Sequence, residues 1–359
     1  MQGLSYYPTR LDNPDLTWEK TDSYNIGVDF SVLRDRLTFT LELYKSYTKD
    51  LLLQVKNAAQ TGFTSRFDNV GSTENSGVEF TVNSHNITKK NFEWTTTFTI
   101  SHNKQMVTDI GIDYEYVPTF TKNDQMLYGY MKGYPVNALW GYQAAGVWHN
   151  DQEREENRYT KTYVSYKDQN GYTKYVDVNH DGVLDQSDQR YLGCSDPVVY
   201  GGLQNTFEIY GLTLGVYFTY SLGGKIYNLS EFNLGSGSPM TNQYRYMLDA
   251  WHVSRNPDSD IPRAGTAQNM LPSSNFVHDA SYLRLQNVMI SYTLDARKWT
   301  KVFRYATISL NAYNVFLLTR YNGFDPDVST NSGDSALRRV AINDYPKSRQ
   351  FTATLQITF

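Results

Sequence analysis

Apolar and polar residues alternate one by one along much of this chain. The clearest case is the stretch 349–359, where apolar side chains take every second position and polar ones the positions between: Phe351, Ala353, Leu355, Ile357 and Phe359 against Thr352, Thr354, Gln356 and Thr358. Because successive side chains of a β-strand point to opposite faces, this pattern predicts a strand with one apolar and one polar face. A soluble sheet can show the same pattern, but the length matches the roughly 9 to 11 residues of a tilted membrane-spanning strand.

The same alternation recurs along the rest of the chain. Further stretches that show it are 24–30, 37–44, 78–83, 94–101, 199–209, 213–220, 288–294 and 308–312. Short connections near residues 34, 88, 210 and 298 alternate with long ones near 56–69, 149–196, 231–275 and 321–346. This alternation is typical of an outer-membrane β-barrel, in which tight turns face the periplasm and large loops face outward. We therefore expect an all-β, transmembrane antiparallel β-barrel with its long extracellular loops at these places.

The direction of the strands gives an expected strand count. If the last strand runs toward the periplasm, antiparallel pairing makes the strand at 134–148 run outward, yet the strand at 91–108 must also run outward. One strand is therefore missing between them, and we place it in the aromatic segment Tyr114–Tyr130. The total is about eleven strands, whereas bacterial single-chain barrels have an even number. We expect residues 1–359 to be the C-terminal part of a single larger barrel domain.

The composition narrows the class of protein. The chain has 359 residues and no run of 18 apolar ones, so a transmembrane helix is not expected. Its 30 Tyr, 6 Trp and 17 Phe suit the aromatic girdles of a barrel, or a sugar-binding surface. The formal net charge of −4 argues against a nucleic-acid partner, and the single Cys194 excludes an internal disulfide. Residues 1–10 lack the apolar core of a signal peptide, so we expect an exported barrel to begin further upstream.

A set of short segments resembles one family of outer-membrane proteins. In chain order they are Leu16–Thr21, Asn69–Gly71 with Asn75–Glu79, Trp140–Tyr142 with Gly146–Trp148, Asp177–Gly182, Trp251 with Asn256–Pro257 and Ile261–Arg263, Ala280–Val288, Tyr321–Asp327, and Tyr345–Pro346 with Arg349. This order is similar to that in the C-terminal half of SusC/RagA-type TonB-dependent outer-membrane transporters of the Bacteroidetes. The closing Phe359 also resembles the C-terminal assembly signal of outer-membrane barrels. His180, where the family usually has Gly, and His252, where it usually has Thr, depart from the pattern.

The resemblance implies active import. It implies a barrel of about 22 strands that holds a plug domain, and a SusD-like surface lipoprotein that covers the outer mouth. The pair would capture an oligosaccharide or a peptide, and TonB would act on the plug region, which is absent from this chain. These residues would supply barrel wall in contact with outer-membrane lipid, together with loops that contact ligand and lipoprotein.

The segment 177–188 has the spacing of a twelve-residue calcium loop. Its oxygen-bearing positions are Asp177, Asn179, Asp181, Asp185 and Asp188, with the backbone carbonyl of Val183 as the sixth ligand. Gly182 stands where such a loop turns sharply. The last position is Asp where calcium loops usually have Glu, which shortens its reach by one methylene group. A structural Ca²⁺ is therefore expected here, and the alternative is an Asp- and Asn-rich surface turn.

Two further sets of residues bear on function. Tyr244, Tyr246 and Trp251, with Arg263 nearby, could form a sugar-stacking platform in the outer vestibule, or could instead pack within their loop or against a partner. The 6 His residues show no HExxH spacing, and no GxSxG motif occurs, so no catalytic residue is expected.

Two alternatives to an importer remain open at this point. A passive outer-membrane porin would share the alternating strands. A secreted, calcium-stabilised glycan-binding β-protein would share the aromatic residues and the acidic loop, although the runs of about nine alternating residues exceed the roughly 5 to 6 of an average strand.

Overall fold

The computed structural model describes residues 11–57, 59–63, 65–111, 115–122, 125–157, 170–235, 242–265, 270–299, 302–328 and 339–359. Within these residues, the largest element is a sheet of nine strands, which we call the wall. In sheet order its strands are β1 (Lys20–Val32), β2 (Leu37–Lys49), β5 (Ser72–Lys89), β6 (Phe92–Asp109), β13 (Val199–Ile209), β14 (Leu212–Leu222), β17 (Tyr282–Asp295), β18 (Tyr305–Thr319) and β20 (Gln350–Thr358). All neighbouring pairs are antiparallel. The sheet is open, because β1 and β20 are its two edges.

Each wall strand has an apolar face and a polar face, as the alternation predicts. On the apolar face, Phe30 and Phe39 lie opposite one another on neighbouring strands, and their rings stack with centroids 4.7 Å apart. On the polar face, Thr97 donates a hydrogen bond of 2.8 Å to Asn83 across two strands. The apolar face is open to the surroundings, and Phe351 on the edge strand is 76% exposed. Such an exposed apolar face is typical of a surface that contacts a membrane or another protein, and the lipid-facing side of a barrel has this pattern.

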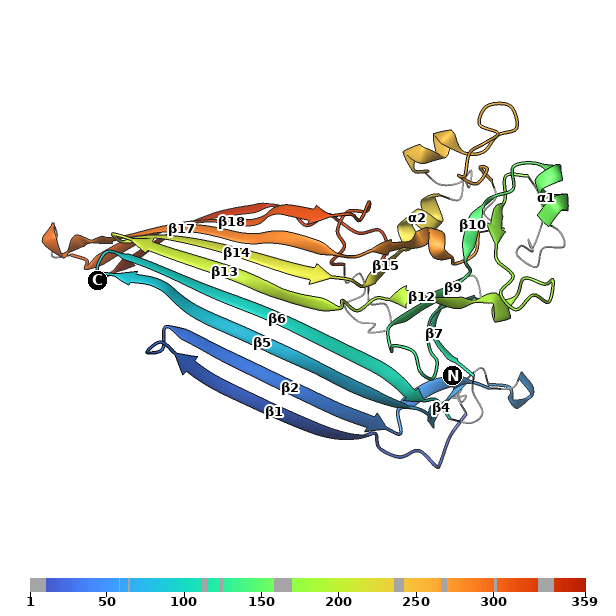
Figure 1. Ribbon diagram of the computed structural model, residues 1–359, viewed down its shortest axis with the longest axis horizontal. Helices are drawn as coiled ribbons and strands as arrows, with labels where there is room; N and C mark the ends of the chain where they lie inside the picture. Colours follow the sequence, from blue (N-terminus) through green and yellow to red (C-terminus); the bar gives the residue numbers. More distant parts are fainter. Residues whose placement is uncertain are drawn as a thin grey trace, which may run out of the picture.

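The connections differ in length at the two ends of the wall (Figure 1). The short ones, at residues 33–36, 90–91, 210–211 and 296–304, lie at one end, which we call the turn end. The long ones, at 50–71, 110–198, 223–281 and 320–349, lie at the opposite end. Among the described residues, no helix combines the length and apolar character needed to cross a membrane.

The described residues of 110–198, 223–281 and 320–349 fold into a structured body, which we call the cap. It contains a four-stranded sheet of β12 (Arg190–Cys194), β9 (Ala138–Gly141), β8 (Gln125–Tyr130) and β7 (Val117–Lys122). It also contains the pair β10 (Ala144–Val147) and β11 (Thr173–Tyr175), the sheet of β16 (Val277–Asp279), β15 (Lys225–Asn228) and β19 (Val340–Ala341), and the helices α1 (Asp151–Asn157) and α2 (Leu229–Leu234). A hairpin of β3 (Leu52–Lys56) and β4 (Ser65–Asn69) lies at the same end of the wall.

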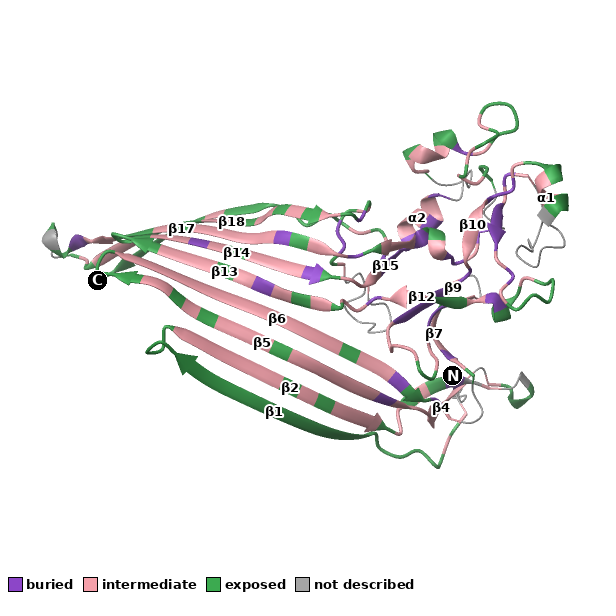
Figure 2. Ribbon diagram, viewed as in Figure 1, coloured by how far each residue is buried: buried purple, intermediate pink, exposed green. Residues whose placement is uncertain are grey.

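The cap has its own hydrophobic core, which the three long connections build together. Leu127 and Leu139 come from the first connection, Tyr227 and Phe276 from the second, and Val340 from the third. The first three of these side chains have no exposed surface. Figure 2 shows the buried residues concentrated in the cap, whereas the wall strands are mostly intermediate or exposed. The cap is therefore stabilised by burial of its own side chains, and the wall by its ladders of hydrogen bonds.

The expected count of eleven strands is corrected by the sheet order. The described residues of the segments 114–130 and 134–148 do not enter the wall but supply β7, β8, β9 and β10 of the cap. Strand β6 instead pairs directly with β13, with Ile100 opposite Gly201. The chain thus leaves the wall after Asp109 and returns to it at Val199, which resolves the conflict in strand direction. The cap strands have at most six residues, too few for the roughly 9 to 11 of a membrane-spanning strand.

Candidate functional site

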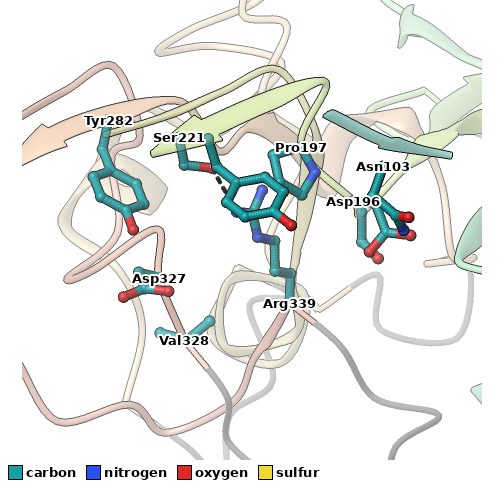
Figure 3. Close-up of a pocket in the computed structure, with 10 residues that line it drawn as sticks. Asn103, Asp196, Pro197, Ser221, Tyr282, Asp327, Val328 and Arg339 are labelled. Carbon is teal, nitrogen blue, oxygen red and sulfur yellow. Dashed lines mark hydrogen bonds between the residues drawn. The ribbon is translucent and has the colours of Figure 1, made fainter. Parts of the chain in front are cut away.

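A pocket of about 450 Å³ lies where the polar face of the wall meets the cap (Figure 3). The wall contributes Asn103 of β6, Tyr200 of β13, Ser221 of β14 and Tyr282 of β17. The cap contributes Asp196, Asp327 and Arg339. The pocket therefore combines aromatic rings, hydroxyl groups, an amide, carboxylates and a guanidinium group.

The register of the wall strands brings the wall residues of the pocket next to one another. Tyr200 lies opposite Ser221, and Ser221 lies opposite Tyr282, so these residues form one row across three strands. Tyr200 also lies opposite Ser101, two residues before Asn103 on the same strand. Because side chains two positions apart share a face, Asn103 joins this row on the polar face. The alternation of the strands therefore directs all four side chains into one space.

Hydrogen bonds and an ion pair hold the charged residues of the cap side. Arg339 donates from Nη2 to the Ser221 hydroxyl over 2.9 Å, which ties the cap to the wall. The carboxylate of Asp196 accepts a bond of 2.8 Å from Asn137. The carboxylate of Asp327 lies 2.7 Å from the ammonium group of Lys347. The positive charge of Arg339 and the negative charges of Asp196 and Asp327 are thus held in place around the pocket.

A tyrosine of a more distant strand supports Asn103. The Tyr44 hydroxyl on β2 donates a hydrogen bond of 2.8 Å to Asn103 Oδ1 on β6, and the ring crosses β5 at Gly77. A Cβ atom added at Gly77 would come within 2.3 Å of the Tyr44 ring and 2.7 Å of the His102 carbonyl oxygen. Gly77 is therefore required for the close approach that fixes Asn103.

A buried ion pair fixes the segment that carries Asp327. Arg284 on β17 donates from Nη2 to both carboxylate oxygens of Asp325, at 2.7 and 2.8 Å. The two side chains are only 4% and 3% exposed. Asp325 also accepts a bond of 2.9 Å from the backbone N–H of Asp327. The pair therefore anchors this part of the 320–349 connection to the wall.

The calcium-like loop 177–188 is held together by hydrogen bonds to its own backbone. Asp177 accepts from the N–H groups of His180 at 2.7 Å and Gly182 at 2.9 Å. Asp188 accepts from Val178 at 2.8 Å and Asp185 at 2.9 Å. Both carboxylates are almost fully buried, and this burial raises the pKa of Asp188 above its ordinary value.

The remaining predicted calcium ligands bond within the loop as well. Asn179 Nδ2 donates to Asp181 over 2.9 Å, and Asp181 accepts from the Val183 N–H over 2.8 Å. Asp185 accepts from Ser187, which lowers the pKa of this carboxyl group. The described residues contain no group of three or more His, Cys, Asp or Glu side chains arranged to share a metal ion. The geometry therefore fits a turn stabilised by its own hydrogen bonds, and Ca²⁺ binding stays a prediction.

His180 stands where the family usually has Gly, and its backbone adopts a conformation that favours Gly. Its φ angle is 63°, in the left-handed region that glycine adopts most easily. This explains why a glycine would suit the position.

The four predicted ligand residues fall into two pairs. Tyr244 and Tyr246 stack with ring centroids 5.7 Å apart, and burial raises the pKa of both phenols. Trp251 and Arg263 both pack against Gly171, where an added Cβ would meet them at 2.5 and 2.8 Å. Tyr244 and Tyr246 thus lie together, as do Trp251 and Arg263, and a single platform of all four residues stays a prediction.

The pocket itself was not found by sequence reasoning. Its residues are separated by up to 236 positions in the chain, between Asn103 and Arg339. Two segments that resemble the family could have indicated the pocket. One contains Tyr282 and Arg284, and the other contains Asp325 and Asp327.

Comparison with known proteins identifies the family. The family model of the TonB dependent receptor-like β-barrel matches residues 2–229. The chain belongs to this family. It is 33% identical to the TonB-dependent receptor P26 of Formosa agariphila over 98% of its length, and 27% identical to the TonB-dependent receptor SusC of Bacteroides thetaiotaomicron over 99%. The solved structure of the RagAB peptide transporter superposes with a TM-score of 0.77 at 25% identity, over 97% of this chain.

Membership in the TonB-dependent receptor family shows which face of the wall contacts lipid. Receptors of this family are outer-membrane β-barrels, so this chain is barrel wall of an outer-membrane protein. The apolar face of the wall meets lipid, and the polar face lines the barrel interior, where the pocket opens. The chain spans 36% of P26, 34% of SusC and 36% of the RagAB transporter chain, and so corresponds to about a third of each.

Proposed function

We propose that this chain is part of an active importer of the outer membrane, which takes up oligosaccharides or peptides and is driven by TonB. Its partner would be a SusD-like surface lipoprotein. The observation that carries the proposal is a polar pocket on the interior face of a wall whose sequence matches TonB-dependent receptors. The similarity to the RagAB peptide transporter supports peptides as a solute class, and the similarity to SusC supports the dependence on TonB.

We infer that the cap end of the wall faces the outside of the cell. Short turns on the periplasmic side and long connections on the outer side are the rule for barrels of this type. In this orientation, the cap lies where a surface lipoprotein would contact the barrel. The pocket lies beneath the cap, on the route of a solute that enters the barrel.

Variants of the pocket test the proposal. A strain that lacks the full-length gene would be complemented with the wild-type protein or with Tyr200→Ala/Tyr282→Ala, and uptake of labelled oligosaccharides and peptides would be measured. We expect the double variant to reduce uptake at limiting solute at least about tenfold, the effect of losing roughly 1.4 kcal/mol of binding free energy. Tyr292→Ala, on the lipid-facing side of β17, serves as the matched control and should import normally.

The same experiment separates an importer from a passive porin. Uptake by the wild-type protein should stop when the inner-membrane proton gradient is dissipated. Uptake that continues without the gradient, and that is unaffected by the pocket variant, would instead identify a porin.

A further inference from the structure

The turn end of the wall carries an excess of positive charge. Six exposed cations lie in or beside its turns: Arg34, Arg36, Lys89, Lys90, Arg297 and Arg304. Two carboxylates, Asp35 and Asp295, accompany them. We call these six cations the basic rim. These cations lie in or beside three of the four turns, those at 33–36, 90–91 and 296–304, and the turns lie along one end of the wall (Figure 1).

Most of the basic rim has no anionic partner within the described residues. Arg297 forms an ion pair of 2.7 Å with Asp295, and Asp35 accepts a hydrogen bond from Ser31. Arg36 donates to a backbone carbonyl oxygen, that of Asn86. Two further carboxylates near this end, Glu93 and Glu208, lie opposite one another on β6 and β13. They belong to the polar face that lines the interior, and Glu93 contacts His85 at 3.2 Å.

Cations at the cap end of the wall show the opposite behaviour. Lys20 lies 3.5 Å from Asp50, and Lys45 lies 2.8 Å from Glu74. Lys132, in the cap, lies 3.4 Å from Asp109. Lys20, Lys45 and Lys132 are thus paired with carboxylates of the protein, whereas, among the described residues, most cations of the basic rim are not.

The basic rim lies at the level of the membrane surface. Exposed apolar residues of the lipid-facing side, Ile209 and Leu212, lie directly beside the 210–211 turn. Tyr210 and Trp299, both exposed, lie in the turns, and such residues favour the boundary between hydrocarbon and headgroups. The cations are therefore at the depth where lipid phosphates lie.

We propose that the basic rim binds anionic glycerophospholipids in the leaflet that meets the turn end. Lys and Arg side chains at a membrane surface attract anionic headgroups, and each contributes a factor of about five in affinity at moderate ionic strength. Neighbouring hairpin turns are two strand spacings apart, roughly 10 Å. The cations of the 33–36 turn and those of the 90–91 turn therefore contact different headgroups. The basic rim would hold a row of anionic lipids around the periplasmic end of the barrel.

Lipid selectivity of the full-length receptor tests this proposal. The protein would be reconstituted in phosphatidylcholine vesicles, and the association of spin-labelled phosphatidylglycerol would be compared with that of spin-labelled phosphatidylcholine. The rim variant is Arg34→Gln/Lys89→Gln/Lys90→Gln/Arg304→Gln. The matched control, Lys20→Gln/Lys45→Gln/Lys49→Gln/Lys132→Gln, removes the same charge at the cap end, where the exposed Lys49 of β2 lies opposite Lys20.

We expect wild-type protein and the cap-end control to prefer phosphatidylglycerol several-fold, a preference that 0.5 M NaCl abolishes. The rim variant should show a ratio near one. Equal association of the two lipids with the wild type, retention of the preference by the rim variant, or its loss in the cap-end control would each overturn the proposal. Heat-modified gel mobility verifies that every variant is folded.

Discussion

At the scale of single residues, the pocket depends on a few close contacts that tolerate little change. Tyr44 reaches Asn103 only because Gly77 has no side chain beneath the ring. We predict that Gly77→Ala lowers the stability of the full-length receptor by about 1–3 kcal/mol, since an added methyl group displaces the ring or the strand. The measurement is the melting temperature of the detergent-solubilised protein.

Gly215 provides the control for this change. It also lies in a wall strand, but the nearest atom to an added Cβ is Met289 Cε, at an ordinary 3.5 Å. Gly215→Ala should leave the melting temperature nearly unchanged. Equal effects of the two substitutions would contradict the role assigned to Gly77.

The ion pair between Arg284 and Asp325 is the second contact of this kind. We predict that Asp325→Ala costs about 3–5 kcal/mol of stability, because it leaves the buried Arg284 charge without a partner. Lys20→Met breaks an exposed pair, at 3.5 Å from Asp50, and should cost at most about 1 kcal/mol. Thermal melting of the two variants side by side makes the comparison, and an equally small loss for both would show that the buried pair does not anchor the loop.

At the scale of elements, the cap and the wall are stabilised in different ways. Leu139 in the cap core has no exposed surface, whereas Leu310 on the lipid face of β18 is 53% exposed in the protein alone. We predict that Leu139→Ala destabilises the cap by about 2–5 kcal/mol and leaves the wall folded. Limited proteolysis should then cleave within the cap of this variant and spare the cap of Leu310→Ala. Loss of barrel gel mobility in Leu139→Ala would argue against an independently stabilised cap.

The predicted binding of Ca²⁺ by the loop 177–188 can be tested by titration. If it binds Ca²⁺, calorimetric titration of the metal-stripped full-length protein should show one saturable site, which Asp181→Asn weakens. Asp181 is exposed, so its substitution keeps the buried bonds of Asp177 and Asp188. Absence of heat in the wild-type protein would leave the loop as a turn stabilised by its own hydrogen bonds.

The sequence predicted the wall strands better than it predicted the cap. Alternation of apolar and polar residues predicted the strands at both edges of the wall, because β1 and β20 each have an apolar and a polar face. The parity of strand directions predicts a further wall strand in the aromatic segment Tyr114–Tyr130, whereas the described residues of this segment form the cap strands β7 and β8. Periodicity shows which face of a strand is apolar, but it does not show which sheet the strand joins. The pocket was missed for a related reason, since Asn103, Tyr282 and Arg339 meet only through sheet order and cap packing.

At the scale of the whole molecule, the open wall requires further strands. The edges β1 and β20 each present unpaired backbone groups, which are costly in hydrocarbon and promote association in water. We predict that this chain alone aggregates when it is refolded in detergent, whereas the full-length receptor stays monodisperse. Size-exclusion chromatography compares the two, and a monomeric isolated chain would show that the wall can satisfy its own edges.

We propose that this chain lines a TonB-driven importer that works with a surface lipoprotein. The most direct test is to express the tagged full-length gene in its native host, extract the outer membrane with detergent, and identify the co-purifying proteins by mass spectrometry. We expect to recover the protein from the outer membrane together with a SusD-like lipoprotein. Recovery from that membrane without any lipoprotein partner would show that the proposed importer is wrong.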